Sequence, residues 1–290
     1  MSVEAQSTLS EHSKEHYNAL GERYTEILNA RAGSFGLGSD RNRCRLVFEF
    51  VRRHFHGKIL ELCCGPGNFT FVMGEHLPYS TIVGTDHSEK FIEIARCQNT
   101  CPNVSFAVQD ATRLSYPDES FDTSVVSLAL HEMEEDDIRS VLNEMRRVTR
   151  NGGKIILIEL HIPENPIARL MFEQGLGDGE RPTTYRLNDY GLPRFLADAG
   201  IAMAEHRIIC MSTVQIAVGV KGAAELVPTF HRDFTSFDPW QHLVVPSVAT
   251  FLSTVSGLVA HQFGGGPHPA APIPAPVDTD VPPPAILSEP

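Results

Sequence analysis

The stretch Lys58-Ile-Leu-Glu-Leu-Cys-Cys-Gly65-Pro-Gly67-Asn-Phe-Thr70 runs from a short apolar segment into two glycines and then into a second apolar segment. This order is typical of a β-strand, a tight turn and a helix. Gly65 and Gly67 allow the backbone to turn sharply and to approach a ligand closely, and the helix after them presents free N–H groups to that ligand. The stretch therefore predicts a ligand-binding turn between a strand and a helix.

Around this stretch, from about residue 41 to residue 222, short β-branched or aliphatic runs alternate with amphipathic helical stretches. Strands are expected at Lys58–Leu62, Thr81–Asp86, Val104–Gln109, Phe121–Leu130, Lys154–Leu160, Glu205–Cys210 and Val214–Lys221. Helices are expected around Arg43–Phe55, Phe69–His76, Glu89–Gln98, Glu135–Val148 and Asn188–Ala199. The last two strands are too close in the chain for a crossover helix, so they should form a hairpin. The sequence predicts an α/β fold, a doubly wound seven-stranded and mostly parallel sheet with a terminal antiparallel hairpin.

Three segments flank this domain of residues 41–222. Residues 1–40 have a helical pattern and end in a glycine-rich loop, which predicts a helical arm. Within residues 223–262, apolar positions from Val248 to Val259 recur at helical spacing, and the polar face carries hydroxyls but no Lys or Arg. This pattern favours a C-terminal helical extension that packs on the domain or on a second copy in a homodimer. Residues 263–290 hold nine of the 20 prolines and are expected to form a disordered tail.

The composition excludes several classes of function. The formal net charge is -12, which disfavours binding to a nucleic-acid backbone. The N-terminus lacks a secretory signal and the chain lacks a long apolar run, so we expect a cytoplasmic protein with no stable membrane insertion. The six cysteines form no regular framework and are expected to be free thiols. No pattern of metal ligands is present, and we expect no metal.

Two acidic residues follow the glycine turn at the ends of the next predicted strands. Asp86 lies 21 residues after Gly65, the position where doubly wound folds bind ribose hydroxyls, and Asp110 closes the following strand. Thr70 stands where a dinucleotide-binding fingerprint has a third glycine or alanine, and no Gly-Lys-Ser/Thr follows the turn. The three strand ends together indicate a nucleoside-binding edge of the sheet.

These motifs resemble, in order and spacing, those of the class I S-adenosylmethionine-dependent methyltransferases. The resemblance covers residues 41–222 and is carried by Glu61–Gly67, Gly84–Asp86, Gln109–Ala111, Phe121–Asp122 and Arg147–Gly153. Tyr17–Tyr24 and Ile156–Pro163 are similar to segments of the ubiquinone/menaquinone-biosynthesis C-methyltransferases and their small-molecule relatives. The segment Ser127–Met133 differs from the Gly-Leu/Ile-Arg-Asn segment of the quinone enzymes.

The resemblance implies S-adenosyl-L-methionine as the cofactor and a small, fairly hydrophobic acceptor, either quinone-like, phenolic or another secondary metabolite. Glu61 would orient the turn or reach the methionine ammonium, Asp86 would bind the ribose, and Asp110 would hold the adenine edge. The implied cofactor-binding residues are Tyr17, Tyr24, Glu61, Gly65, Gly67, Asp86, His87, Asp110, Ala111 and Leu128. The two tyrosines would close over the cofactor from the arm, although their spacing also fits a helix-packing stripe.

Catalytic candidates follow the fourth and fifth predicted strands. His131 is a candidate base or substrate-orienting group because imidazole titrates near neutral pH, or else it caps the next helix or bonds a backbone carbonyl. Glu132 and His161 share the same edge, but Glu132 also begins an acidic run that suits a helix N-terminus. The long connection 161–186 suits a lid, a binding loop or a short packing helix.

Three functions remain open on the sequence alone. The first is methyl transfer to a small molecule. The second is a cofactor-binding partner subunit without catalysis, with residues 223–262 as its contact surface. The third is a nicotinamide-dependent oxidoreductase, which Thr70 and the absence of a Tyr-x-x-x-Lys pair disfavour.

Overall fold

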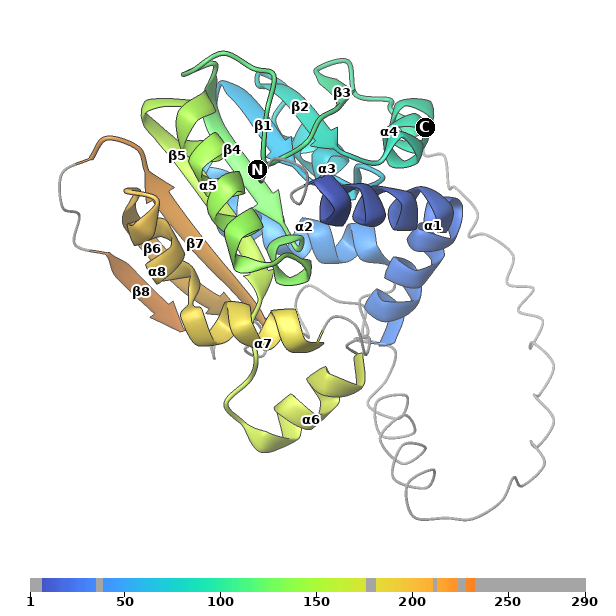
Figure 1. The fold of residues 1–290 in the computed structure, drawn as a ribbon, viewed down its shortest axis with the longest axis vertical. Helices are drawn as coiled ribbons and strands as arrows, with labels where there is room; N and C mark the ends of the chain where they lie inside the picture. The colour runs from blue at the N-terminus through green and yellow to red at the C-terminus, as the bar shows by residue number, and fades with distance from the viewer. Residues whose placement is uncertain (1–6, 35–38, 176–180, 211–212, 224–227, 233–290) are drawn as a thin grey trace, which may run out of the picture. The chain divides into compact units, whose positions relative to one another are not determined.

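The computed structural model describes residues 7–34, 39–175, 181–210, 213–223 and 228–232. The chain divides into two units, residues 1–244 and 245–290, and all described residues lie in the first. The described part contains one eight-stranded sheet in the order β3-β2-β1-β4-β5-β7-β6-β8, covered by helices (Figure 1). The strands are β1 Lys58–Leu62, β2 Thr81–Asp86, β3 Val104–Val108, β4 Phe121–Ser127, β5 Thr149–Leu160, β6 Ala202–Ile209, β7 Val214–Val220 and β8 Thr229–Arg232.

The sheet is parallel from β3 to β5, and β7 pairs antiparallel with both β5 and β6. The expected parallel sheet and terminal hairpin are therefore confirmed. The expected number of seven strands is wrong for the described residues, because β8 pairs parallel with β6. Strand β8 lies in the segment for which the sequence predicts a helical extension. Its four residues are too few to show a strand pattern in the sequence, and pairing with β6 supplies the missing hydrogen bonds.

Helices lie on both faces of the sheet (Figure 1). They are α1 Ser7–Ser34, α2 Asp40–Val51, α3 Asn68–His76, α4 Glu89–Gln98, α5 Glu135–Val148, α6 Pro166–Gly175, α7 Arg181–Tyr190 and α8 Leu192–Asp198, with 3-10 turns η1 Arg52–His54 and η2 Leu130–Glu132. Successive residues of a strand point to opposite faces, so Ile59 of β1 packs in one core with Phe48 of α2, whereas Leu60 packs in the other core with Leu142 of α5. These two cores hold the sheet between its helical layers.

The region before the terminal hairpin contains more helices than expected. One helix was expected around Asn188–Ala199, but α7 and α8 are separate helices because Gly191 between them has a positive φ of 86°. The long connection that begins at His161 contains α6, which agrees with the short packing helix among its alternatives.

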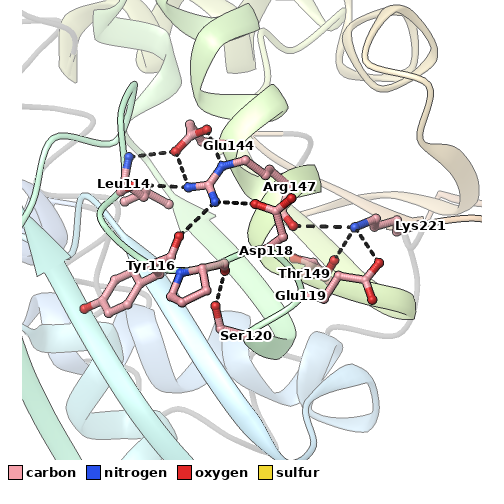
Figure 2. Close-up of polar contacts among 10 residues, drawn as sticks. Leu114, Tyr116, Asp118, Glu119, Ser120, Glu144, Arg147, Thr149 and Lys221 are labelled. Carbon is pink, nitrogen blue, oxygen red and sulfur yellow. Dashed lines mark hydrogen bonds and ion pairs between the residues drawn. The ribbon is translucent and has the colours of Figure 1, made fainter.

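Arg147, near the end of α5, fastens the segment that joins β3 to β4 (Figure 2). Its guanidinium donates hydrogen bonds to the carbonyl oxygens of Leu114 at 3.0 Å and Tyr116 at 2.8 Å. It also pairs with Glu144 and Asp118, each at 2.8 Å. The segment begins near Asp110, at the carboxyl end of β3. The hydrogen bonds of Arg147 therefore fix the later part of the same segment, residues 114–118.

Several sequence-based expectations fall on residues that the structure does not describe. These are the loop at residues 35–38, the helix expected at Val248–Val259 and the tail at residues 263–290. Within the described ranges, no helix combines the length and the apolar character needed to cross a bilayer.

Candidate active site

The carboxyl ends of β1 and β2 place an acidic side chain directly beside the glycine turn. The N–H of Gly65 donates a hydrogen bond to Oδ2 of Asp86, and the N–H of Ser88 donates to Oδ1, each at 2.9 Å. Asp86 is only 6% exposed, and this burial raises the pKa of its carboxyl group. The structure thus brings the ribose-binding candidate Asp86 together with the glycine turn that is predicted to approach a ligand.

Both glycines of the turn have positive φ angles, 53° at Gly65 and 89° at Gly67. A Cβ atom on Gly67 would lie 2.9 Å from Cζ of Phe106, so a side chain there would collide with β3. A Cβ atom on Gly65 would have Cε1 of Tyr24 as its nearest neighbour, at 3.9 Å. Gly67 therefore serves the fold, whereas a side chain at Gly65 would meet Tyr24 of the arm only at ordinary van der Waals distance.

Glu61 and Thr70 form a buried pair under the turn. The hydroxyl of Thr70 donates a hydrogen bond to Oε2 of Glu61 at 2.5 Å. Burial raises the pKa of Glu61 to about 8, although the hydrogen bond from Thr70 acts in the opposite direction. This contact ties β1 to α3, which agrees with a turn-orienting role for Glu61; a contact with the methionine ammonium stays a prediction. It also explains why position 70 is not a third glycine.

The arm helix α1 packs its two tyrosines on the helix that follows β2. The ring centroids of Tyr17 and Tyr24 lie 5.7 Å and 4.9 Å from that of Phe91 in α4. Tyr17 also lies 5.9 Å from the ring of His87. Nε2 of His87 is buried and has no hydrogen-bond partner among the described residues. The structure thus shows the helix-packing alternative, and closure of the two tyrosines over a cofactor stays a prediction.

The end of β3 contributes Asp110 and Ala111. Oδ1 of Asp110 accepts hydrogen bonds from the N–H and the hydroxyl of Thr112, at 2.8 Å and 2.7 Å. The side chain is exposed, and Ala111 is half-buried. The preceding Gln109 donates its N–H to the carbonyl oxygen of Asp86 at 3.0 Å. Asp110 is thereby held near the ribose-binding candidate.

Cys63, at the end of β1, marks the point where the acidic side chains converge. Burial and four nearby carboxylates raise the pKa of its thiol well above the ordinary value. These carboxylates are, in decreasing order of effect, those of Asp86, Asp110, Glu159 and Glu61. A thiol of raised pKa is a poor nucleophile at neutral pH, so Cys63 fits a structural part of the site.

The ends of β4 and β5 bring together His131 and Glu159. His131 is 5% exposed, and its Nδ1 lies 2.8 Å from Oε2 of Glu159. Leu128, a candidate wall of the pocket, begins this turn with a positive φ of 54°. Sequence reasoning missed Glu159, and its signal was a single acidic residue in the apolar run of β5.

The other two catalytic candidates lie differently. Oε1 of Glu132 is 3.9 Å from Nε2 of His131, so these residues are neighbours. The backbone N–H of His161 donates to the carbonyl oxygen of Thr213 at 2.9 Å, and His161 contributes to the lowered pKa of His206, after burial as the main cause. The backbone of His161 is thus held by Thr213, the residue before β7, and its side chain lies near His206 of β6.

The residues at this edge fit S-adenosylmethionine. The buried carboxylate of Asp86 suits vicinal hydroxyls, and Nε2 of His87 is a buried polar atom without a hydrogen-bond partner among the described residues. Among the described residues, no group of three or more His, Cys, Asp or Glu side chains is arranged to hold a metal ion.

Comparison with known proteins agrees with this geometry. A family model for a methyltransferase domain matches residues 59–153. An uncharacterized methyltransferase of Synechocystis is 27% identical over 65% of this chain and 87% of its own length. A demethylmenaquinone methyltransferase of Thermotoga maritima is 32% identical over 53% of this chain and 63% of its own length. The chain spans between about half and two thirds of the length of the demethylmenaquinone methyltransferases that it matches.

A solved structure supports the fold alone. It is a complex between the Haloferax volcanii Trm112 methyltransferase activator and its partner protein; the match has a TM-score of 0.52 at 16% identity and covers 71% of this chain and 98% of the other. The matched domain begins in β1, contains the glycine turn and Asp86, and ends in β5. Residues 59–153 are therefore similar to a methyltransferase domain, and this match includes the glycine turn and Asp86.

Proposed function

We propose that this protein transfers the methyl group of S-adenosylmethionine to a small, fairly hydrophobic acceptor. The observation that carries the proposal is the hydrogen bond from the Gly65 N–H to the buried Asp86, which fixes a carboxylate suited to ribose hydroxyls beside the glycine turn. Asp86 would hold the ribose, and Asp110 and Ala111 would hold the adenine. Leu128 and His87 would form walls of the cofactor pocket. When bound, S-adenosylmethionine supplies a methyl group that its sulfonium has already activated.

The chain's own contribution is to orient the acceptor, exclude water and accept a proton. His131 is buried at the end of β4, on the edge that carries Asp86 and Gly65. Its imidazole would take a proton from the acceptor, with Glu132 beside it. His161 stays a candidate for orienting the acceptor from the hairpin side.

The acceptor class rests on the helices near His131. Helix α7 contacts η2, which contains His131, and Glu173 of α6 accepts a hydrogen bond from the hydroxyl of Tyr185 in α7. Buried Phe172 gives α6 an apolar side chain on its inner side. This surrounding suits a quinone-like, phenolic or similar secondary metabolite, and the names of several relatives point to demethylmenaquinone.

Calorimetric titration with S-adenosylhomocysteine tests the cofactor site. We expect micromolar binding to the wild-type protein and a loss of at least roughly tenfold in Asp86→Ala, since two hydroxyl contacts to a carboxylate are removed. Glu93→Ala, an exposed acidic residue of α4, is the control and should bind normally. Failure of the wild-type protein to bind would overturn the proposal.

A further inference from the structure

We propose that Glu159 is a positioning residue for methyl transfer: it holds the His131 ring in the tautomer whose Nε2 is free to accept a proton. The inference rests on the proposed function and narrows its substrate class to acceptors that must lose a proton, such as a hydroxyl or an acidic carbon. In the reaction, the acceptor atom bonds to the methyl carbon and the electron pair of the broken C–S bond stays on sulfur. The acceptor's proton moves to Nε2.

Glu159 is completely buried, and both of its carboxylate oxygens are occupied by hydrogen-bond donors. Oε1 accepts the backbone N–H groups of Ala129 at 2.8 Å and Leu130 at 2.6 Å. Oε2 accepts the N–H of Leu160 at 3.1 Å and contacts Nδ1 of His131 at 2.8 Å. A carboxylate is retained in such a place only when donors surround it, and here one of those donors is the imidazole.

The contact with Glu159 determines where the His131 ring carries its proton. Glu159 accepts all three of its backbone hydrogen bonds, as a carboxylate does, so we assign the proton of its contact with His131 to Nδ1. In the neutral ring, Nε2 is then unprotonated and available as a base. Oε1 of Glu132 lies 3.9 Å from Nε2, which is beyond hydrogen-bond length, so this contact does not occupy Nε2.

The backbone also holds this turn against β5. Ser127, the last residue of β4, is paired with Ile158, and the N–H of Leu128 donates to the carbonyl oxygen of Ile158 at 2.8 Å. Leu128 then takes its positive φ of 54°, a conformation that costs a non-glycine residue roughly 1–2 kcal/mol. Glu159 binds the next three residues, so one side chain fixes both the turn and the imidazole that it carries.

Nitrogen NMR of histidine tests the assignment without an acceptor. The protein is labelled with ¹⁵N-histidine and recorded at about pH 9, well above the ordinary imidazole pKa of about 6.5. His131→Asn identifies the signal. We expect a protonated Nδ1 and an unprotonated Nε2 in the wild-type protein.

Glu159→Gln is the matched variant. Two N–H groups, of Ala129 and Leu130, bond Oε1, and only that of Leu160 bonds Oε2. The amide orientation that keeps more of these hydrogen bonds therefore turns the new NH₂ group toward Nδ1 of His131. The imidazole then has to accept at Nδ1, and its proton moves to Nε2. We expect the two ring nitrogens to exchange their chemical shifts, which a purely structural role for Glu159 would not produce.

A wild-type ring protonated at Nε2 would overturn the inference, and so would an unchanged tautomer in a folded Glu159→Gln protein. The wild-type spectrum decides the question alone if the variant does not fold. Titration of both proteins with S-adenosylhomocysteine is the separate readout of the cofactor site. If the protein binds S-adenosylhomocysteine but His131 is protonated at Nε2, only the inference about Glu159 is overturned. If His131 has the expected tautomer but the protein does not bind S-adenosylhomocysteine, the proposed function is overturned.

Discussion

The side-chain oxygen of Asn18 in α1 accepts a hydrogen bond from the hydroxyl of Ser88, the residue that caps α4, with 2.7 Å between the two oxygens. Asn18 also accepts the N–H of Lys90 at 3.2 Å. The N–H of Ser88 is bonded in turn to Asp86. The arm is therefore connected through one residue to the carboxylate assigned to the ribose.

Asn18→Ala should release the arm from α4. The change removes two hydrogen bonds at a helix N-terminus, which are worth about 1 kcal/mol, so the arm should open roughly fivefold more often. Trypsin cleavage at the exposed Arg23 measures this opening, with and without S-adenosylhomocysteine. Lys14→Ala, which removes the exposed ion pair with Glu89, is the control and should change cleavage little. Equal cleavage of Asn18→Ala and the wild-type protein would contradict the prediction.

Glu61 should make the protein less stable as the pH rises. The folded chain keeps the Glu61 proton up to about pH 8, whereas the unfolded chain loses it near 4.5. Between these values the folded state binds more protons, so the free energy of unfolding falls with increasing pH. Glu61→Gln has no such proton, and it should gain about 2 to 4 kcal/mol relative to the wild-type protein between about pH 5 and pH 8. Urea denaturation at both pH values measures the difference.

Glu144→Gln is a control of opposite sign. A hydrogen bond from Arg147 lowers the pKa of Glu144, so its stabilising effect is complete above the unfolded value of 4.5 and is lost as the pH falls through the folded value. Glu144→Gln should therefore be less stable than the wild-type protein at about pH 8, and this deficit should shrink in acid. The same direction of change in both variants would show that the titration is not set by these local contacts.

Gly67→Ala should cost more stability than Gly152→Ala. Both glycines have positive φ angles, 89° and 74°, so both alanines carry a strain of roughly 1–2 kcal/mol. Only at position 67 does the added Cβ meet another atom within 3 Å, the Cζ of Phe106, whereas position 152 has open space. Thermal unfolding compares the two variants, and Gly67→Ala alone should also lose affinity for S-adenosylhomocysteine. Equal melting temperatures of the two variants would contradict the prediction and would show that Phe106 of β3 moves to accommodate the new methyl group.

Arg147→Lys should loosen the segment between β3 and β4. A lysine cannot replace the fork of donors that reaches the carbonyl oxygens of Leu114 and Tyr116, so we expect a loss of roughly 1–2 kcal/mol. Amide hydrogen exchange of residues 110–120 should accelerate. Arg146→Lys, an exposed neighbour in the same helix, should leave both exchange and stability unchanged.

Local patterns predict the elements that build the site. The bounds of β1, β2, α4 and α5 agree with the sequence-based expectations, because each has a clear apolar period and a flanking turn or cap. Strand β5 begins at Thr149 and not at Lys154, since Arg150–Gly153 carry little apolar signal and are in the strand only through their neighbours. The split between α7 and α8 depends on the backbone of Gly191, which composition alone does not reveal.

The candidate site also contains a part that the sequence predicts and a part that depends on tertiary structure. Gly65 and Asp86 can be paired from the sequence because parallel strand ends meet at one edge of a sheet. The pairing of His131 with Glu159 depends on the alignment of Ser127 with Ile158 across β4 and β5. That alignment is a tertiary property, and an isolated acidic residue in an apolar run only indicates that some partner exists.

Strand β8 determines which backbone the sheet presents to other chains. Without Thr229–Arg232, the outer edge of β6 would expose its N–H and C=O groups along Glu205–Ile208, where a second molecule could add a strand. A protein shortened at Gly222 would keep the entire glycine turn, Asp86 and His131, yet it would gain an aggregation-prone edge. The short final strand thus protects the edge of β6 against aggregation, although it lies far along the chain from the residues of the candidate site.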